Sequence, residues 1–253
     1  MPTACRSMNN PFSLSGKTVL VTGATAGLGR QTAITVSQMG ARVIATGRSH
    51  ERLACTLQKM EGPGHRVIAV DLVNVNDRDS LVRDLPALDG VVHCAGITLL
   101  HPFKFSDEKR YHEVYSINVE APLFLTQRIF KAKLLNQAAS IVFISSISPN
   151  VGTKGHAIYS GSKAALHGIS RVLAHELAAQ KIRSNCISPG MVQTEVAIGM
   201  AKQISQELLA ADEARYPLGY GAPEDVANAA VFLLSPASKW ITGINLIMDG
   251  GVT

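Results

Sequence analysis

The sequence predicts one α/β domain over residues 1–253, built as a doubly wound parallel sheet of about seven strands with helices on both faces. Two observations predict this class. Short apolar runs rich in β-branched residues alternate with stretches of helical pattern along the chain, and most of the runs lack the in/out alternation of a half-exposed strand, which indicates a sheet buried on both faces. The chain shows no internal repeat or linker, and 46% of its 253 residues are hydrophobic, enough for one large core.

Each element follows from its local pattern. The strands are expected at 18–22, 42–46, 66–70, 90–94, 140–145, 183–188 and 245–248. The helices are expected near 28–39, 49–60, 76–84, 108–135, 157–180, 201–211 and 224–234. The last helix has a clear start, because Pro223 is followed by Glu224 and Asp225, and proline and acids favour the first helical turn.

Charge and composition exclude several function classes. The chain has 24 Lys and Arg against 19 Asp and Glu, a net charge of +5, but the basic residues are scattered and only one Trp and five Tyr could stack on bases. This argues against nucleic-acid binding and suits an enzyme that attracts an anionic cofactor or substrate. Four cysteines lie far apart without a CxxC pair, so neither a disulfide framework nor a metal site is expected, and a reducing cytoplasm is the expected location.

No apolar run has the roughly 18 residues that a membrane helix needs, so no membrane association is expected. The start of the chain lacks the apolar core of a secretory signal, and residues 1–12 are expected to form a disordered extension.

A glycine-rich turn directly follows the first strand. Gly23, Gly27 and Gly29, with Thr25 and Leu28 between them, lie where the strand must turn into a helix. Glycine allows positive φ and lets backbone N–H groups approach a pyrophosphate at the positive end of the helix. The spacing differs from the common GxGxxG fingerprint, and the absence of GK[ST] excludes a Walker-type nucleotide hydrolase. The turn therefore predicts a dinucleotide site.

The end of the second strand selects the nucleotide. An acid there would bind the ribose hydroxyls of NAD, whereas an arginine pairs with the 2′-phosphate of NADP. Gly47 and Arg48 occupy this place, with no carboxylate before Glu51. The sequence therefore favours NADP(H) over NAD(H), although Arg48 could also merely open the next helix on a solvated face.

A tyrosine, a lysine and a serine form a candidate catalytic group. Tyr159 and Lys163 are four residues apart and share one face if helical, and Ser146 follows the fifth strand. A neighbouring ammonium stabilises a phenolate and lowers the tyrosine pKa, so that Tyr159 could transfer a proton near neutral pH. The alternative is an ordinary amphipathic helix pair and a serine that caps a strand.

Together these residues resemble the short-chain dehydrogenase/reductase family, whose fold is of the Rossmann type, over nearly the whole chain. The family's active-site Asn, Ser, Tyr and Lys correspond to Asn118, Ser146, Tyr159 and Lys163. The cofactor contacts that the resemblance implies fall on Gly23, Thr25, Gly27, Leu28, Gly29, Arg48, Asp71, Leu72, Ala95, Gly96, Tyr159, Lys163, Pro189, Gly190, Val192 and Thr194. Asp71 corresponds to the family's acidic residue after the third strand, which lies near the adenine. The tail 241–243 and 249–251 also matches the family pattern.

One motif departs from the family. The family usually has Asn-Asn-Ala-Gly after the fourth strand, and this chain has His93 and Cys94 before Ala95 and Gly96. The small pair that lets the backbone approach the adenosine half is kept. The strand context predicts that His93 and Cys94 are packed residues and not a base and a nucleophile.

The resemblance implies interconversion of a carbonyl and a secondary alcohol. Hydride passes to the carbonyl carbon, Tyr159 supplies the proton, Ser146 holds the oxygen, Lys163 lowers the tyrosine pKa and contacts the ribose, and Asn118 supports a water in the proton relay. Residues 191–216 are expected to form a mobile lid that selects the substrate.

The general pattern is closest to 3-oxoacyl-carrier-protein reductases, so a 3-oxoacyl thioester or similar β-keto compound is the expected substrate. His175 stands where those enzymes often have a basic residue for carrier docking. Two alternatives stay open, a keto-sugar or polyol dehydrogenase of the same family and a nucleotide-binding regulator without turnover. The family also implies a homotetramer or homodimer.

Overall fold

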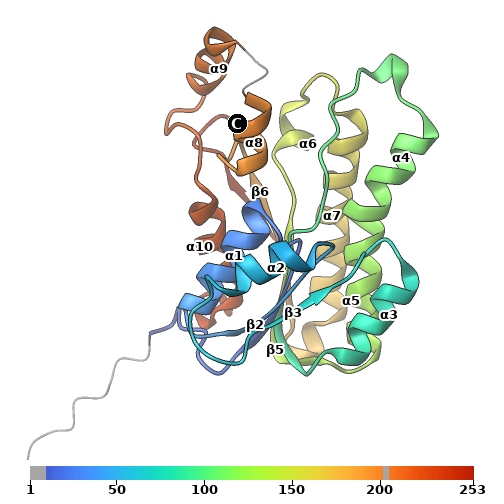
Figure 1. The fold of residues 1–253 in the computed structure, drawn as a ribbon, viewed down its shortest axis with the longest axis vertical. Helices are drawn as coiled ribbons and strands as arrows, with labels where there is room; N and C mark the ends of the chain where they lie inside the picture. Colours follow the sequence, from blue (N-terminus) through green and yellow to red (C-terminus); the bar gives the residue numbers. More distant parts are fainter. Residues whose placement is uncertain (1–9, 202–204) are drawn as a thin grey trace, which may run out of the picture.

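A computed structural model describes residues 10–201 and 205–253, and its centre is a parallel sheet of seven strands in the order β3-β2-β1-β4-β5-β6-β7 (Figure 1). The strands are β1 (Thr18–Thr22), β2 (Arg42–Gly47), β3 (Arg66–Ala69), β4 (Leu88–His93), β5 (Leu135–Ile144), β6 (Arg183–Pro189) and β7 (Asn245–Met248). Every neighbouring pair is parallel, and β1 lies between β2 and β4, with Val19 opposite Val43 on one side and Gly90 on the other. The predicted fold class is confirmed.

Helices cover both faces of this sheet. The α-helices are α1 (Gly27–Gln38), α2 (His50–Leu57), α3 (Val75–Asp84), α4 (Glu108–Tyr115), α5 (Ala121–Lys131), α6 (Ser148–Val151), α7 (Ala157–Glu176), α8 (Glu195–Ala201), α9 (Gln206–Glu213) and α10 (Pro223–Leu234). Short 3-10 turns lie at Phe103–Phe105, Ala178–Gln180 and Pro236–Ser238, and a π-helical turn, η2, at Ser116–Glu120.

Two hydrophobic cores fill the two layers. On one face α1, α2 and α10 cover the sheet, and Leu53 and Leu233 are fully buried among the strand residues there (Figure 1). On the other face α3, α5 and α7 bury Leu81, Leu125 and Leu166 against β4, β5 and β6. Burial on both faces explains why the strand sequences are apolar without alternation.

Two predicted helices differ from the structure. The stretch 108–135 is not one helix, because the π-helical turn η2 separates α4 from α5 and β5 begins at Leu135. The early part of β5 escapes a hydrophobicity pattern because Asn136 and Gln137 are exposed and Ala138 has a φ of +63°. The helix expected at 201–211 is replaced by α8 and α9, and residues 202–204 lie outside the described residues.

The start of the chain lies only partly within the described residues. Residues 1–9 of the expected extension 1–12 lie outside the described residues, whereas Pro11 O accepts a 3.0 Å hydrogen bond from Ala237 N and the ring of Phe12 lies 6.3 Å from that of Phe232. In the part of the chain that the structure describes, no helix is both long and apolar enough to cross a bilayer.

Candidate active site

The predicted functional residues gather at the carboxyl edge of the sheet. The glycine turn follows β1, Ala95 and Gly96 follow β4, and Ser146 follows β5, and these strands are neighbours. In open α/β sheets the crevice beyond the carboxyl ends of the strands is the usual ligand site, at the point where the chain order reverses. Here that reversal lies between β1 and β4.

Two glycines of the turn have no room for a side chain. Gly23 has a φ of +68°, and a Cβ there would lie 2.7 Å from Ala95 N. A Cβ on Gly29 would lie 2.3 Å from Gly23 O. Both distances are too short for real atoms. Glycine at position 23 therefore lets the turn close against the residues after β4, and glycine at position 29 lets α1 start directly against the turn.

The turn leaves the start of α1 open to an anion. The helix begins at Gly27 and Leu28, its N-cap Ala26 provides no side-chain hydrogen bond, and its first turn contains no acidic residue. The first N–H groups of a helix lack internal partners and carry a partial positive charge. Thr25 lies in the turn, and its carbonyl accepts a hydrogen bond of 2.5 Å from Arg30 Nη2. These features fit the pyrophosphate of a dinucleotide.

Arg48, predicted to select the nucleotide, follows β2, and the predicted cofactor contacts Asp71 and Leu72 follow β3. Arg48 is exposed directly after β2, and Ser49 caps α2 by accepting a hydrogen bond from Arg52 N. Asp71 and Leu72 follow β3, with Leu72 buried and Asp71 Oδ1 accepting a hydrogen bond from Val73 N.

The catalytic candidates lie close together. Tyr159 and Lys163 are one turn apart on α7, and Lys163 Nζ lies 5.9 Å from the centroid of the tyrosine ring. The same ammonium donates a 2.8 Å hydrogen bond to Ile144 O at the end of β5. Burial raises the pKa of Tyr159, and a hydrogen bond with Ser146 acts in the opposite direction. The structure thus brings Ser146, Tyr159 and Lys163 into one group.

The pKa values of Tyr159 and Lys163 are set mainly by burial. The sequence predicts that Lys163 lowers the pKa of Tyr159, whereas in the structure burial has the largest effect and raises the pKa of Tyr159. Burial also lowers the pKa of Lys163 itself, to about 8. The physical reason is that both groups lie in a poorly solvated place, where the neutral forms of phenol and amine are favoured.

The side chain of Asn118 is fully engaged within the protein. It lies in the π-helical turn η2 and is 1% exposed. Its Oδ1 accepts a hydrogen bond from Ile97 N, and its Nδ2 donates to Ile97 O and to Ser162 Oγ. Single π turns inside helices often mark functional sites. These contacts fasten the loop after Gly96 to α7, so the side chain has a positioning role in addition to any role in a water relay.

His93 and Cys94 are packed into the fold. His93 is 4% exposed, stacks on Phe143 and shares a hydrogen bond of 2.8 Å between Nε2 and Thr126 Oγ1. Burial lowers the pKa of His93 to about 3 and raises that of the Cys94 thiol to about 12. A histidine that stays neutral and a thiol that stays protonated are poor candidates for a base and a nucleophile.

The segment after β6 contacts the glycine turn. Pro189 O accepts a hydrogen bond from Ile147 N, Gly190 N donates to Met248 O, and Val192 pairs with Gly221 in an isolated bridge. Thr194 lies against Gly27, since a Cβ there would be 3.5 Å from Thr194 Cβ.

The expected lid begins at this contact. An ion pair of 2.6 Å joins Arg30 Nη1 of α1 to Glu195 Oε1 of α8. A cavity of about 390 Å³ opens beside it, lined by Arg30, Thr194 and Glu195 among others. The two helices of the lid, α8 and α9, project beyond the carboxyl edge of the sheet (Figure 1).

Several positioning residues escaped the sequence analysis. Ser162 links Asn118 to Tyr159, because its Oγ also donates a 2.7 Å hydrogen bond to Tyr159 O. The ring of His156 lies 5.5 Å from that of Tyr159, nearly edge-on. The hydroxyl of Ser145 donates to Lys163 O and contacts His167 Nε2 at 2.8 Å. Spacing on α7 is a signal for His167 alone, which lies one turn after Lys163, whereas Ser145 and His156 lie outside this helix.

Comparisons with known proteins identify the family of the chain. The family profile described as Enoyl-(Acyl carrier protein) reductase matches residues 23–253. The 3-oxoacyl-[acyl-carrier-protein] reductase FabG of Rickettsia felis is 34% identical over 243 residues, which cover 95% of this chain and 98% of the relative.

Solved structures show the same relationship. A putative short-chain alcohol dehydrogenase from Sinorhizobium meliloti has a TM-score of 0.88 at 32% identity and covers 96% of this chain and 98% of its own. A putative NAD(P) dependent gluconate 5-dehydrogenase from Beutenbergia cavernae, described with bound NADP, has a TM-score of 0.86 at 31% identity and covers 96% and 99%. The chain therefore belongs to the short-chain dehydrogenase/reductase family and is an NAD(P)-dependent oxidoreductase.

Proposed function

We propose that this enzyme reduces a ketone to a secondary alcohol with NADPH, on a 3-oxoacyl thioester or a similar β-keto compound. The observation that carries the reaction is the group of half-buried Tyr159 and Ser146 with buried Lys163 at the carboxyl edge of the sheet. When bound, the reduced nicotinamide supplies the hydride. The protein supplies binding, orientation and the proton.

Each residue of the group has a distinct task. Tyr159 is protonated at neutral pH, because burial raises its pKa, so it acts as the general acid toward the carbonyl oxygen. Ser146, which contacts the same phenol, donates to that oxygen. Lys163, with a pKa lowered to about 8, exchanges a proton near physiological pH, which supports a role in reprotonating the tyrosine.

The cofactor preference rests on the end of β2. Arg48 is exposed there, and no carboxylate precedes Glu51 in the sequence, so a 2′-phosphate would meet a guanidinium and no repelling charge. The Beutenbergia cavernae structure described with bound NADP supports the same preference. The glycine turn, Ala95, Gly96 and the segment from Pro189 to Thr194 would line the rest of the cofactor site, with the adenine at Asp71 and Leu72 after β3.

The substrate class rests on the relatives. Several similar curated proteins are 3-oxoacyl-[acyl-carrier-protein] reductases, and one solved neighbour is a putative betaketoacyl-ACP reductase. A keto sugar or sugar acid is the second candidate, because two structural neighbours are putative gluconate dehydrogenases. His175 is exposed on α7, and its imidazole would offer an acidic carrier protein fewer hydrogen-bond donors than the guanidinium of an arginine would.

A screen of NADPH oxidation separates the candidates. Acetoacetyl thioesters, free keto sugars, keto acids and simple ketones are each offered with NADPH and with NADH. We expect the acetoacetyl thioesters to react fastest, and a carrier-linked substrate to lose affinity steeply as salt increases. Turnover of a keto sugar without turnover of any thioester would overturn the acyl assignment and keep the rest of the mechanism.

A further inference from the structure

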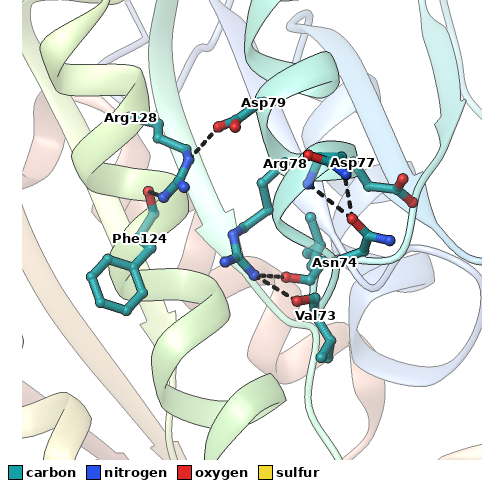
Figure 2. Close-up of polar contacts among 9 residues, drawn as sticks. Val73, Asn74, Asp77, Arg78, Asp79, Phe124 and Arg128 are labelled. Atoms are coloured by element: carbon teal, nitrogen blue, oxygen red, sulfur yellow. Dashed lines mark hydrogen bonds and ion pairs between the residues drawn. The ribbon is translucent and has the colours of Figure 1, made fainter.

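Arg78 is a buried arginine of α3 outside the predicted set of site residues. It is 5% exposed and lies with Leu81 on the buried face of the helix. Its hydrogen bonds go to main-chain carbonyls, because Nη1 donates to Leu72 O and, at 3.1 Å, to Val73 O (Figure 2). Burying a guanidinium is costly, and here the cost is offset by contacts to one short turn of the chain.

The charges around Arg78 do not account for its placement. Burial and nearby Arg128 lower the pKa of Arg78, while Asp79 and Glu120 oppose this effect. In the described part of the chain, neither of these two acids forms an ion pair with Arg78, and Asp79 pairs with Arg128 instead at 2.5 Å. The contacts to the two carbonyls are therefore the specific interactions of this side chain.

The turn that Arg78 contacts is the predicted adenine-binding segment. Asp71 and Leu72 follow β3, and Asp77 Oδ2 accepts a hydrogen bond from Asp71 N. Asn74 Oδ1 caps α3 by accepting hydrogen bonds from Asn76 N and Asp77 N (Figure 2). Because a peptide group is planar, fixing the carbonyl of Leu72 also fixes the N–H of Val73. Arg78 thus sets the orientation of two successive peptide groups in this segment.

The docking of α3 has a separate anchor. The ion pair between Asp79 and Arg128 joins α3 to α5, and Arg128 Nη1 also donates to Phe124 O (Figure 2). This anchor does not involve the turn after β3. It therefore provides a matched comparison, since its loss should loosen the helix pair without removing the contacts to Leu72 and Val73.

We infer that Arg78 is a positioning residue for the adenosine end of the cofactor site, holding the main chain of Leu72 and Val73 in the shape that receives the adenine. This inference rests on the proposed function, because that function places the adenine at this turn. It assigns a specific role in nucleotide affinity to a side chain that does not touch the reacting atoms.

Binding measurements with fragments of the cofactor test the inference. Arg78→Met, Arg78→Lys and the control Arg128→Met are compared with the wild type for binding of NADPH, of 5′-AMP and of reduced nicotinamide mononucleotide, which lacks the adenosine half. We expect Arg78→Met to raise the Kd for NADPH and for 5′-AMP about tenfold, the effect of losing one or two hydrogen bonds. The Kd for reduced nicotinamide mononucleotide and kcat at saturating NADPH stay unchanged.

The controls separate a specific role from a structural one. Arg128→Met is expected to lower the melting temperature but to keep the wild-type ratio between the two fragment affinities. Arg78→Lys keeps a charged donor, so we expect its Kd values for NADPH and 5′-AMP to lie between those of wild type and Arg78→Met. If Arg78→Met does not fold, these Kd values of Arg78→Lys test the inference. The inference would be overturned if folded Arg78→Met bound 5′-AMP as tightly as wild type does. It would also be overturned if the variant bound 5′-AMP and reduced nicotinamide mononucleotide more weakly by the same factor. A wild type that binds neither NADPH nor 5′-AMP would instead contradict the proposed function, and the inference with it.

Discussion

Asn118 and Ser162 are joined inside the protein by a hydrogen bond of 3.0 Å from the amide Nδ2 to the hydroxyl Oγ. The same hydroxyl donates to Tyr159 O, so a side chain in the π-helical turn is connected through one serine to the backbone of the catalytic tyrosine. Both residues are buried, at 1% and 0% exposure. The chain of contacts continues to Ile97, which lies just beyond Gly96.

Removing the serine hydroxyl tests this connection. Ser162→Ala leaves Asn118 Nδ2 and Tyr159 O each without one partner in a buried place, so we expect a loss of about 1–3 kcal/mol in the free energy of unfolding. Urea denaturation measures it. The control Ser80→Ala alters an exposed serine of α3 and is expected to stay within about 0.5 kcal/mol of wild type. Equal stability of the two variants would contradict the proposed link.

The phenol of Tyr159 is expected to be needed for chemistry and not for cofactor binding. Tyr159→Phe keeps the ring but removes the proton donor, so we expect turnover to fall roughly 10²–10⁴-fold while the Kd for NADPH changes little. Steady-state kinetics and NADPH fluorescence titration give the two values. Tyr111→Phe on α4 serves as control, since that tyrosine is exposed. Wild-type turnover by Tyr159→Phe on a good substrate would remove Tyr159 from the role of acid.

The choice between NADPH and NADH is expected to depend on Arg48. Arg48→Asp exchanges a cation for an anion, and we expect it to weaken NADPH binding about 10–100-fold relative to NADH. Gly47→Asp is a less clean variant, because a Cβ at Gly47 would lie 2.5 Å from Thr25 Cγ2 and disturb the glycine turn for both cofactors. Titration of both nucleotides into the wild type comes first, and tighter binding of NADH there would refute the preference.

His93 is expected to destabilise the enzyme in acid. Its pKa is about 3 in the folded protein and 6.5 in a model peptide, so the unfolded chain binds a proton between these pH values that the folded chain does not. Neutral, packed His93 therefore makes its full contribution to the free energy of unfolding above pH 6.5, and this contribution is lost as pH falls toward 3. His93→Gln removes this effect. We therefore expect the free energy of unfolding of His93→Gln, relative to that of wild type, to increase by on the order of 3 kcal/mol as pH falls from 6.5 to 4. Urea titrations at several pH values measure both free energies. If the difference between the two proteins stayed constant across this pH range, His93 would not have the lowered pKa that the prediction requires.

We expect the enzyme to form homodimers or homotetramers. Leu125 and Leu166 pack into their own core, so they do not provide the interface, whereas Phe124 and Val172 are 37% and 55% exposed on α5 and α7. An assembled protein would cover these side chains, and Val172→Glu would weaken the assembly. Multi-angle light scattering at micromolar concentration gives the mass, and a wild-type monomer there would reject the expectation.

The sequence was sufficient for the sheet and for the glycine turn after its first strand, because buried parallel strands and short motifs leave local patterns. The roles of Ser146, Tyr159 and Lys163 stay predictions, although the structure places these residues close together. It was insufficient where the fold depends on distant contacts. The π-helical turn at Asn118 interrupts a stretch with helical pattern, and its side chain contacts Ile97 and Ser162, far apart in sequence. Leu135 begins β5 by pairing with Leu88, which no local hydrophobicity indicates. The raised pKa of Tyr159 likewise depends on burial, which the spacing of Tyr159 and Lys163 along the chain does not reveal.

The ion pair between Arg30 and Glu195 has a consequence for the order of ligand binding. It fastens the first residue of α8 to the first turn of α1, the helix whose start would receive the pyrophosphate. A cofactor that orders this turn would therefore also order the base of the lid, and by thermodynamic reciprocity a bound substrate would tighten cofactor binding by the same factor. Because the Glu195 side chain is 68% exposed, the ion pair contributes at most about 1 kcal/mol. Through this contact, one ligand can therefore raise the affinity for the other by no more than about fivefold.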